Sequence, residues 1–193
     1  VPSGNPTVPT AGPEGIQWPE LPEVPQVPVP EETGNGGTIK EEQMSSGSEF
    51  VEGVAIRNKS STQVDIAEML AHRPHIHITH TDEPQVLIMH THTTEFYMEY
   101  DAGFYNETDL TRTQDETKNV VAVGEVIAAQ LRAAGIGVIH DTTVHDYPKY
   151  NGAYDRSKET VEKNLQQYPT IQVVLDIHRD SIMRDSSTKV KPT

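Results

Sequence analysis

Cysteine is absent from this chain of 193 residues. Without thiols the protein can have neither a disulfide framework nor a thiolate metal site. Any metal ion would therefore be held by histidine, aspartate or glutamate. The lack of cysteine is compatible both with the cytoplasm and with the cysteine-poor exterior of many bacteria, so it leaves the compartment open.

Basic residues are scarce as well. Lys and Arg number 15 against 29 Asp and Glu, and the formal net charge is −14. Such a chain cannot neutralise a phosphate backbone, which argues against nucleic acid as a partner. No apolar run approaches the roughly 20 residues that span a bilayer. The chain begins with Val1 rather than Met, and no signal peptide follows. We therefore expect a trimmed product or a fragment.

Proline is abundant, and many of the 14 prolines crowd the front of the chain. Between residues 21 and 30 a proline recurs every two or three positions. Each proline fixes φ and removes a backbone donor, so this stretch should be extended and solvated. We predict a Pro-rich disordered linker over residues 1–37.

Residues 38–83 form a predicted lead-in segment. Residues 50–56 have the composition of a strand, and residues 65–70 could make one or two helical turns before Pro74. Residues 75–80 alternate polar and apolar side chains, as an edge strand does. The three histidines of this segment could be metal ligands. Because no carboxylate or buried strand accompanies them, we interpret them as polar surface residues.

From residue 84 onward, short apolar runs alternate with helical patterns. This order of strand, helix, strand, helix, strand predicts a parallel sheet with right-handed crossovers, the first half of a doubly wound α/β fold. Residues after Asp180 read as a polar tail. The apolar runs are residues 86–89, 136–141 and 171–177, and the helices begin at Asn119 and near Ser157.

A histidine follows each predicted core strand: His90, His140 and His178. In an open parallel sheet the carboxyl ends of the strands lie at one edge, where ligands bind. Imidazoles with a carboxylate and no thiol are the ligands of a catalytic zinc site with one position open to water. The same histidines could equally serve as hydrogen-bond donors, so the pattern leaves both interpretations open.

Four segments carry a resemblance to the stage II sporulation protein P family, in order and with suitable spacing between about Ala55 and Asp180. They are HTHTTE (residues 90–95), NVVAVG (119–124), HDYPKYNGAY (145–154) and LDIHRD (175–180). The resemblance implies a zinc-dependent N-acetylmuramoyl-L-alanine amidase of endospore-forming bacteria, with a doubly wound, amidase-like α/β domain. Residues 84–193 would be the N-terminal part of that domain.

The resemblance also implies a cellular setting. The protein would be tethered to the membrane by an N-terminal helix absent from this chain, with its catalytic domain outside the cytoplasm. There it would thin peptidoglycan during engulfment, together with a lytic transglycosylase and a small membrane protein. The implied reaction is hydrolysis of the amide between N-acetylmuramic acid and L-alanine.

Carried over to this sequence, the two zinc histidines of the family match His90 and His178. Glu95 is our choice for the carboxylate ligand, with Asp115 or Glu116 as alternatives. The resemblance leaves His140 without a metal role.

Further residues are expected to support the site. His92 could orient a ligand. Arg179 could do the same or contact the muropeptide, or form a structural ion pair. Tyr150, Asn151 and Tyr154 could line a sugar–peptide groove, or belong to a loop that packs on itself.

In relatives the domain continues beyond the third strand and provides a late glutamate. We therefore expect the general base beyond Thr193 and a C-terminally incomplete domain. Two other functions stay open: a non-catalytic peptidoglycan-binding or scaffold module with structural zinc, and a zinc hydrolase of small amides.

Overall fold

The computed structural model describes Glu20, Glu23 and residues 26–43, 49–51, 54–56, 58, 61–72, 74–109 and 111–192. Most of the predicted linker lies outside these residues. The chain divides into two compact units. The first comprises Val1–Pro25, Ile78–Tyr97 and Arg112–His178, and the second comprises Gln26–His77, Met98–Thr111 and Arg179–Thr193.

The first unit is built on a parallel sheet of three strands. β4 (Thr81–Met89) lies between β6 (Ile136–His140) and β7 (Val173–Asp176), and both pairings are parallel. The middle strand is covered on both faces, since the neighbouring side chains Leu87 and Ile88 are both fully buried. Burial on both faces explains why β4 ends in a continuous apolar run rather than an alternating one.

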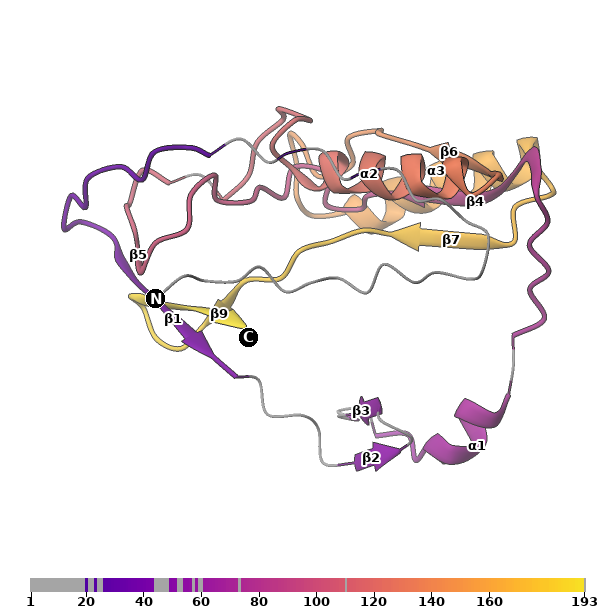
Figure 1. Cartoon of the computed structure of the whole chain (residues 1–193), viewed down its shortest axis with the longest axis horizontal. Helices are drawn as coiled ribbons and strands as arrows, with labels where there is room; N and C mark the ends of the chain where they lie inside the picture. Colours follow the sequence, from indigo (N-terminus) through magenta and orange to yellow (C-terminus); the bar gives the residue numbers. More distant parts are fainter. Residues whose placement is uncertain are drawn as a thin grey trace. The chain divides into compact units, whose positions relative to one another are not determined.

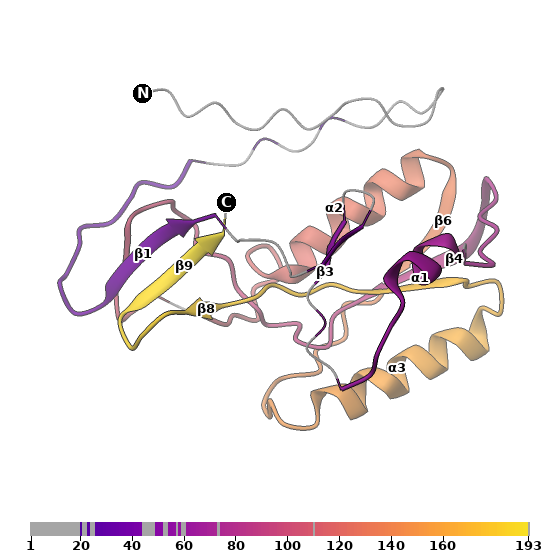
Figure 2. The ribbon, with the colours of Figure 1, turned by 90° about the horizontal axis from the view of Figure 1, so that it is seen from below.

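Two helices cover opposite faces of this sheet. Ile88 of β4 packs in a cluster with Ala128 of α2 (Val120–Ala133). Leu87 points to the other face, where Val161 of α3 (Ala153–Gln167) packs against it. Figure 2 shows the two helices on either side of β4. The predicted α/β class with a parallel sheet is confirmed.

The helix ends follow from local chemistry. The side chain of Asn119 accepts a hydrogen bond from the N–H of Val121 at 2.9 Å and so caps α2. Gly135, just beyond the helix, has a φ of 75°, which glycine adopts at little cost. The predicted start of α3 near Ser157 is wrong. The helix begins at Ala153, and the hydroxyl of Ser157 donates back to the carbonyl of Tyr154 at 3.1 Å.

The second unit contains a sheet of four strands in the order β5-β1-β9-β8. β1 (Gly37–Glu42) pairs in parallel with β9 (Thr188–Pro192), and Figure 1 shows these indigo and yellow strands side by side. β5 (Phe104–Tyr105) and β8 (Ile182–Met183) complete the sheet. The interpretation of the residues after Asp180 as a polar tail is therefore wrong, because the backbone of β9 pairs with β1.

Smaller elements lie before β4. β2 (Glu49–Val51) and β3 (Val54–Ile56) pair with each other in antiparallel fashion, so the single strand predicted over residues 50–56 is two. α1 (Ile66–Ala71) follows, capped by Asp65, whose side chain accepts from the N–H of Glu68 at 3.0 Å. None of the helices in the described part of the chain has the length and apolarity to span a membrane.

The edge strand predicted over residues 75–80 does not form. Residues 74–79 have no regular structure, and β4 starts only at Thr81. The backbone of Thr79 is instead bonded by a side chain, because Gln85 accepts from its N–H and donates to its carbonyl, both at 2.7 Å. His80 bonds the carbonyl of Ala134 through Nδ1 at 2.8 Å. The bonds from Gln85 take the place of the backbone hydrogen bonds that a neighbouring strand would make to Thr79.

Candidate metal centre

The segment that follows β4 is polar and yet buried. Every residue from 90 to 96 is at most 9% exposed. The hydroxyl of Thr93 donates to the carbonyl of His90 at 2.9 Å, and the N–H of Glu95 donates to the carbonyl of His92 at 3.0 Å. Among the described residues, no buried side-chain nitrogen or oxygen lacks a hydrogen-bond partner. This bonding offsets a burial cost of about 1–3 kcal/mol for each polar group.

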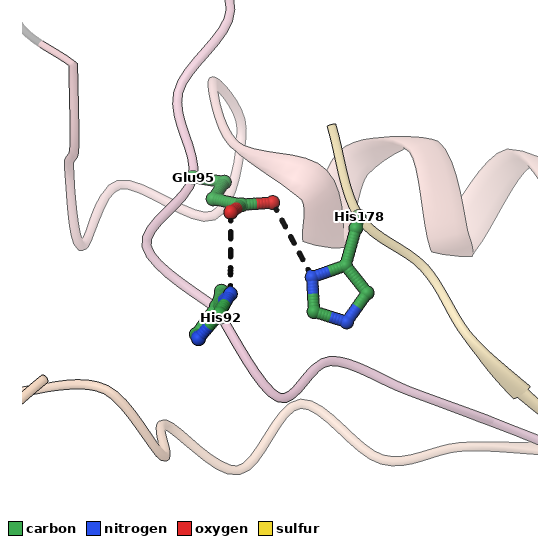
Figure 3. A group of neighbouring side chains, drawn as sticks. All are labelled: His92, Glu95 and His178. Carbon is green, nitrogen blue, oxygen red and sulfur yellow. Dashed lines mark ion pairs between the residues drawn. The ribbon is translucent and has the colours of Figure 1, made fainter. Parts of the chain in front are cut away.

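Three side chains converge after β4 and β7: His92, Glu95 and His178 (Figure 3). Nδ1 of His92 lies 3.4 Å from Oε1 of Glu95, and Nδ1 of His178 lies 3.6 Å from Oε2. One ligand atom from each residue lies within 4.8 Å of the others. Two ligands about 2.1 Å from a tetrahedral zinc ion would be roughly 3.4 Å apart. Each measured separation is close to this value, and the two histidines face different oxygens of Glu95.

The donor set fits zinc as well. Two imidazole nitrogens and one carboxylate oxygen are common ligands of catalytic zinc, whose fourth position is left to water or substrate. The side chains of His92 and Glu95 are 11% and 8% exposed, whereas that of His178 is 29% exposed. The group is thus enclosed on one side and reaches solvent on the other. The structure contains residues able to hold the predicted Zn²⁺.

The topology of the sheet explains why these residues meet. From β4 the chain passes through α2 to β6 on one side, and later through α3 to β7 on the other. Ligands of open α/β sheets bind where the connections diverge in this way. His92 and Glu95 follow β4, and His178 follows β7.

Asp176, the last residue of β7, holds the ring of His178. Its Oδ2 lies 2.9 Å from Nε2 of His178, the nitrogen that does not face Glu95. The same carboxylate accepts from the N–H and the hydroxyl of Thr91, each at 2.8 Å. Burial alone would raise the pKa of Asp176, but the bonds from Thr91 and His178 outweigh it and lower the pKa below its ordinary value.

His90 is not part of this group, contrary to its predicted position as a ligand. Its ring is fully buried, with Nδ1 3.2 Å from the carbonyl of Ile177 and Nε2 2.9 Å from Nε2 of His140. Both ring nitrogens of His90 are thus engaged by partners other than Glu95. Burial is the main cause that lowers the pKa of His90. His92, expected only to orient a ligand, lies where His90 was predicted.

The rings of His140 and His90 pack against α2 at Gly124. Nδ1 of His140 lies 2.9 Å from Oε2 of Glu125, and the bond to His140 is the main cause that lowers the pKa of Glu125. A methyl group at Gly124 would come within 2.7 Å of both imidazoles. The helix thus approaches the two rings so closely that only glycine fits at this position. His140 stands apart from the candidate ligands, as the resemblance implied.

An ion pair between a partly exposed arginine and a buried aspartate supports the loop after β4. The carboxylate of Asp146 is fully buried and forms an ion pair with Arg112. It also accepts from the N–H of Thr94 at 3.1 Å and from its hydroxyl at 2.8 Å. Nη2 of Arg112 lies 3.9 Å from Oε1 of Glu95. Neither residue was predicted from the sequence: Arg112 has no local pattern that points to the site, and Asp146 lies in the motif HDYPKYNGAY without a signal for this role.

Two of the predicted substrate-binding residues lie beside the candidate ligand histidines. The ring of Tyr150 stacks on His92 with centroids 4.6 Å apart. Tyr154 contacts His92 edge-on at 5.4 Å and lies nearly parallel to His178 at 6.5 Å. Both tyrosines are more than half exposed. Asn151 is exposed in the intervening loop, and its carbonyl accepts from Arg156 at 3.4 Å.

The remaining candidates have other contacts. Arg179 belongs to the second unit, where it donates to the carbonyl of Thr111 at 2.6 Å. The alternative carboxylate Asp115 is exposed and accepts from Thr117. The other alternative, Glu116, lines a cavity of about 590 Å³ beside α2. Of the three carboxylates considered, Glu95 is the one that meets two histidines.

One supporting residue had a signal in the sequence. Asp176 and His178 are two positions apart on an extended chain, and such residues share a side. That spacing predicts a carboxylate–histidine pair at the end of a strand. The choice between His90 and His92 had no such signal, since both lie at alternate positions of the same segment.

The fold and site define an α/β protein with a His–Glu–His group at the carboxyl ends of two adjacent parallel strands. A profile of the family described as stage II sporulation protein P matches residues 20–191. The chain belongs to this family, and the resemblance seen in the four motifs is confirmed at that level.

Two further comparisons bear on how far this likeness extends. Stage II sporulation protein P of Bacillus subtilis (strain 168) is 32% identical over 113 residues, which are 55% of this chain and 27% of that protein. This chain therefore spans only about a quarter of the relative's length. No solved structure is significantly similar to it.

Proposed function

We propose that this protein is a zinc-dependent N-acetylmuramoyl-L-alanine amidase, which cleaves the amide between N-acetylmuramic acid and L-alanine in peptidoglycan during sporulation. The observation that carries the proposal is the meeting of His92, Glu95 and His178 within 4.8 Å in a chain of this family. The doubly wound, amidase-like fold and the extracytoplasmic, membrane-tethered setting are parts of the same proposal. So are the lytic transglycosylase and small membrane protein as partners.

The three proposed ligands would hold the ion through Nδ1 of both histidines and a carboxylate oxygen of Glu95. When bound, zinc polarises a carbonyl and lowers the pKa of a bound water to about 7, which is the chemistry amide hydrolysis requires. Arg112, 3.9 Å from Glu95, compensates the negative charge of its carboxylate. The enclosed side of the site limits where a substrate can enter.

Tyr150 and Tyr154 are placed to contact the substrate. Both lie against the ligand histidines and are more than half exposed, so a sugar or peptide bound near the ion would meet their rings. Aromatic side chains with an exposed polar end suit a ligand that is partly apolar and partly polar. This supports a role for both in binding the muropeptide.

The proposal is tested first by metal binding. The chelator-treated chain should bind one zinc ion in isothermal titration calorimetry, and His178→Ala should bind it more than about 100-fold less tightly. Removing only a hydrogen-bond partner of a ligand costs about 10–100-fold, and loss of the ligand should exceed that. His75→Ala, the same change at an exposed histidine of the second unit, serves as the control and should bind as the wild type does.

The second test is release of new amino termini from purified peptidoglycan. Zinc-loaded wild type and His75→Ala should release them, and His178→Ala should not. Zinc binding without release would leave the ligand assignment standing, and it would fit either a binding or scaffold module or a general base beyond Thr193, as the resemblance implies. Unchanged zinc affinity in His178→Ala would contradict the ligand assignment.

A further inference from the structure

We propose that Asp176 is a positioning residue that fixes the tautomer of His178, so that Nδ1 of this ring is the atom presented to the ion. The inference rests on the proposed metal site. It concerns which nitrogen of His178 carries the proton before any ion binds.

The hydrogen bonds of Asp176 determine the position of that proton. Its carboxylate receives the N–H of Thr91, the hydroxyl of Thr91 and Nε2 of His178, at 2.8, 2.8 and 2.9 Å. An ionised carboxylate only accepts hydrogen bonds. The nitrogen of His178 that faces it must therefore carry hydrogen. A neutral imidazole protonated at Nε2 has its lone pair at Nδ1.

The free lone pair points to the right place. Nδ1 of His178 lies 3.6 Å from Oε2 of Glu95 (Figure 3), which is the separation expected of two ligands of one zinc ion. In the opposite tautomer, Nε2 and the carboxylate of Asp176 would turn two lone pairs toward each other at 2.9 Å. A hydrogen would then occupy the ligand position at Nδ1.

The surroundings of Asp176 keep its carboxylate in this orientation. Thr91 is 1% exposed, and its hydroxyl also lies 2.8 Å from the hydroxyl of Ser157, a buried residue of α3. Thr91 lies in the loop after β4 and is itself bonded to α3, so α3 supports Asp176 only through Thr91. His92 is held differently, since its ring is stacked on Tyr150.

Asp176→Asn separates this role from a merely structural one. The amide oxygen can still accept from the N–H of Thr91, but the amide nitrogen then donates to Nε2 of His178. The ring proton should move to Nδ1, and zinc affinity should fall by about 10–100-fold, as for other hydrogen-bond partners of metal ligands. Thr91→Val is the matched control. It removes one bond to Asp176 and lowers the unfolding midpoint, and it should leave the tautomer unchanged.

The tautomer itself is measured by nitrogen-15 NMR of the histidine rings of the metal-free wild type, at mildly alkaline pH where imidazole is neutral. Hydrogen on Nε2 of His178 supports the proposal, and hydrogen on Nδ1 overturns it whether or not Asp176→Asn folds. Unchanged zinc affinity in a folded Asp176→Asn also overturns it. If the wild type binds no zinc, the proposed function fails, and the NMR result still decides the state of the ring.

Discussion

The three-stranded sheet of the first unit and the four-stranded sheet of the second unit are stabilised in different ways. In the first unit, the middle strand β4 is buried on both faces, with Leu87 and Ile88 fully covered by helices. In the second unit, the parallel pair β1 and β9 carries surface ion pairs. Glu42 of β1 pairs with Arg184, and Lys191 of β9 lies 2.7 Å from Asp101.

This difference indicates where each unit is sensitive. Buried apolar area contributes about 25 cal/mol per Å², and this contribution is not an electrostatic attraction that salt screens. Exposed ion pairs contribute little and are screened by salt. The first unit should therefore respond mainly to changes in packing, and the second to changes in charge.

The largest effect is expected where packing is tightest. Leu87→Ala should lower the free energy of unfolding by about 2–5 kcal/mol, because it leaves a cavity between β4 and α3. Val190→Ala in β9, at an 8% exposed residue, should cost only about 1–2 kcal/mol, at about 0.8 kcal/mol for each lost methylene equivalent. Urea denaturation followed by circular dichroism measures both. Equal losses would show that burial does not distinguish the units.

A smaller effect is expected from one added methyl group under α2. Alanine in place of glycine within a helix usually adds about 1 kcal/mol of stability. At Gly124 the new Cβ would lie 2.6 Å from Nε2 of His140 and 2.7 Å from the ring of His90. Such overpacking costs about 1–3 kcal/mol. We therefore expect Gly124→Ala to lose about 1 kcal/mol net.

Gly103→Ala in the second unit is the matched control for this change. A Cβ there would meet nothing within 4 Å. The substitution should be neutral or should gain about 0.4–1 kcal/mol through the unfolded state. A gain at both glycines, measured by thermal unfolding, would show that the two imidazoles leave room below α2.

The smallest effect is a change in alkaline stability of the second unit. Burial, followed by the hydrogen bond to Asp109, raises the pKa of Tyr100 to about 12. The folded state holds the proton of Tyr100 more tightly than the unfolded state does, in which the pKa is about 10. The contribution of this hydroxyl to the free energy of unfolding is therefore complete below pH 10. It is lost as pH rises from about 10 to about 12.

Tyr100→Phe should remove this contribution. Wild type should be the more stable protein near neutral pH, and the difference should shrink as pH rises through that window. Unfolding midpoints measured at a series of pH values test this. Tyr147→Phe, at an exposed tyrosine of the first unit, is the control for the loss of a hydroxyl group. A difference that is constant with pH would contradict the role of Asp109.

Much of the first unit could be predicted from local sequence. The apolar runs before His90, His140 and His178 became β4, β6 and β7, and the 3.6-residue period after Asn119 became α2. Glu95 and His178 were correctly expected to lie at the same edge, because parallel strands end together.

The predictions that failed depended on what a segment contacts. Residues 75–80 alternate as a strand does, but Gln85 bonds the backbone that a neighbouring strand would have bonded. Ser157 has the chemistry of a helix cap, and its hydroxyl bonds within α3 instead. Residues 188–192 are mostly polar, and they form β9 because the backbone of β1 is available for pairing.

The sequence by itself determined the class of fold, the three core strands and the presence of histidines and carboxylates at their ends. Only the tertiary structure decided that His92, rather than His90, faces Glu95. The orientation of each imidazole ring depends on hydrogen bonds between residues far apart in the chain. The ring of His90 bonds Ile177, 87 positions away, and Asp176, which bonds the ring of His178, is held by Thr91, 85 positions away. Periodicity and capping act over a few residues, and they contain no information on such distant partners.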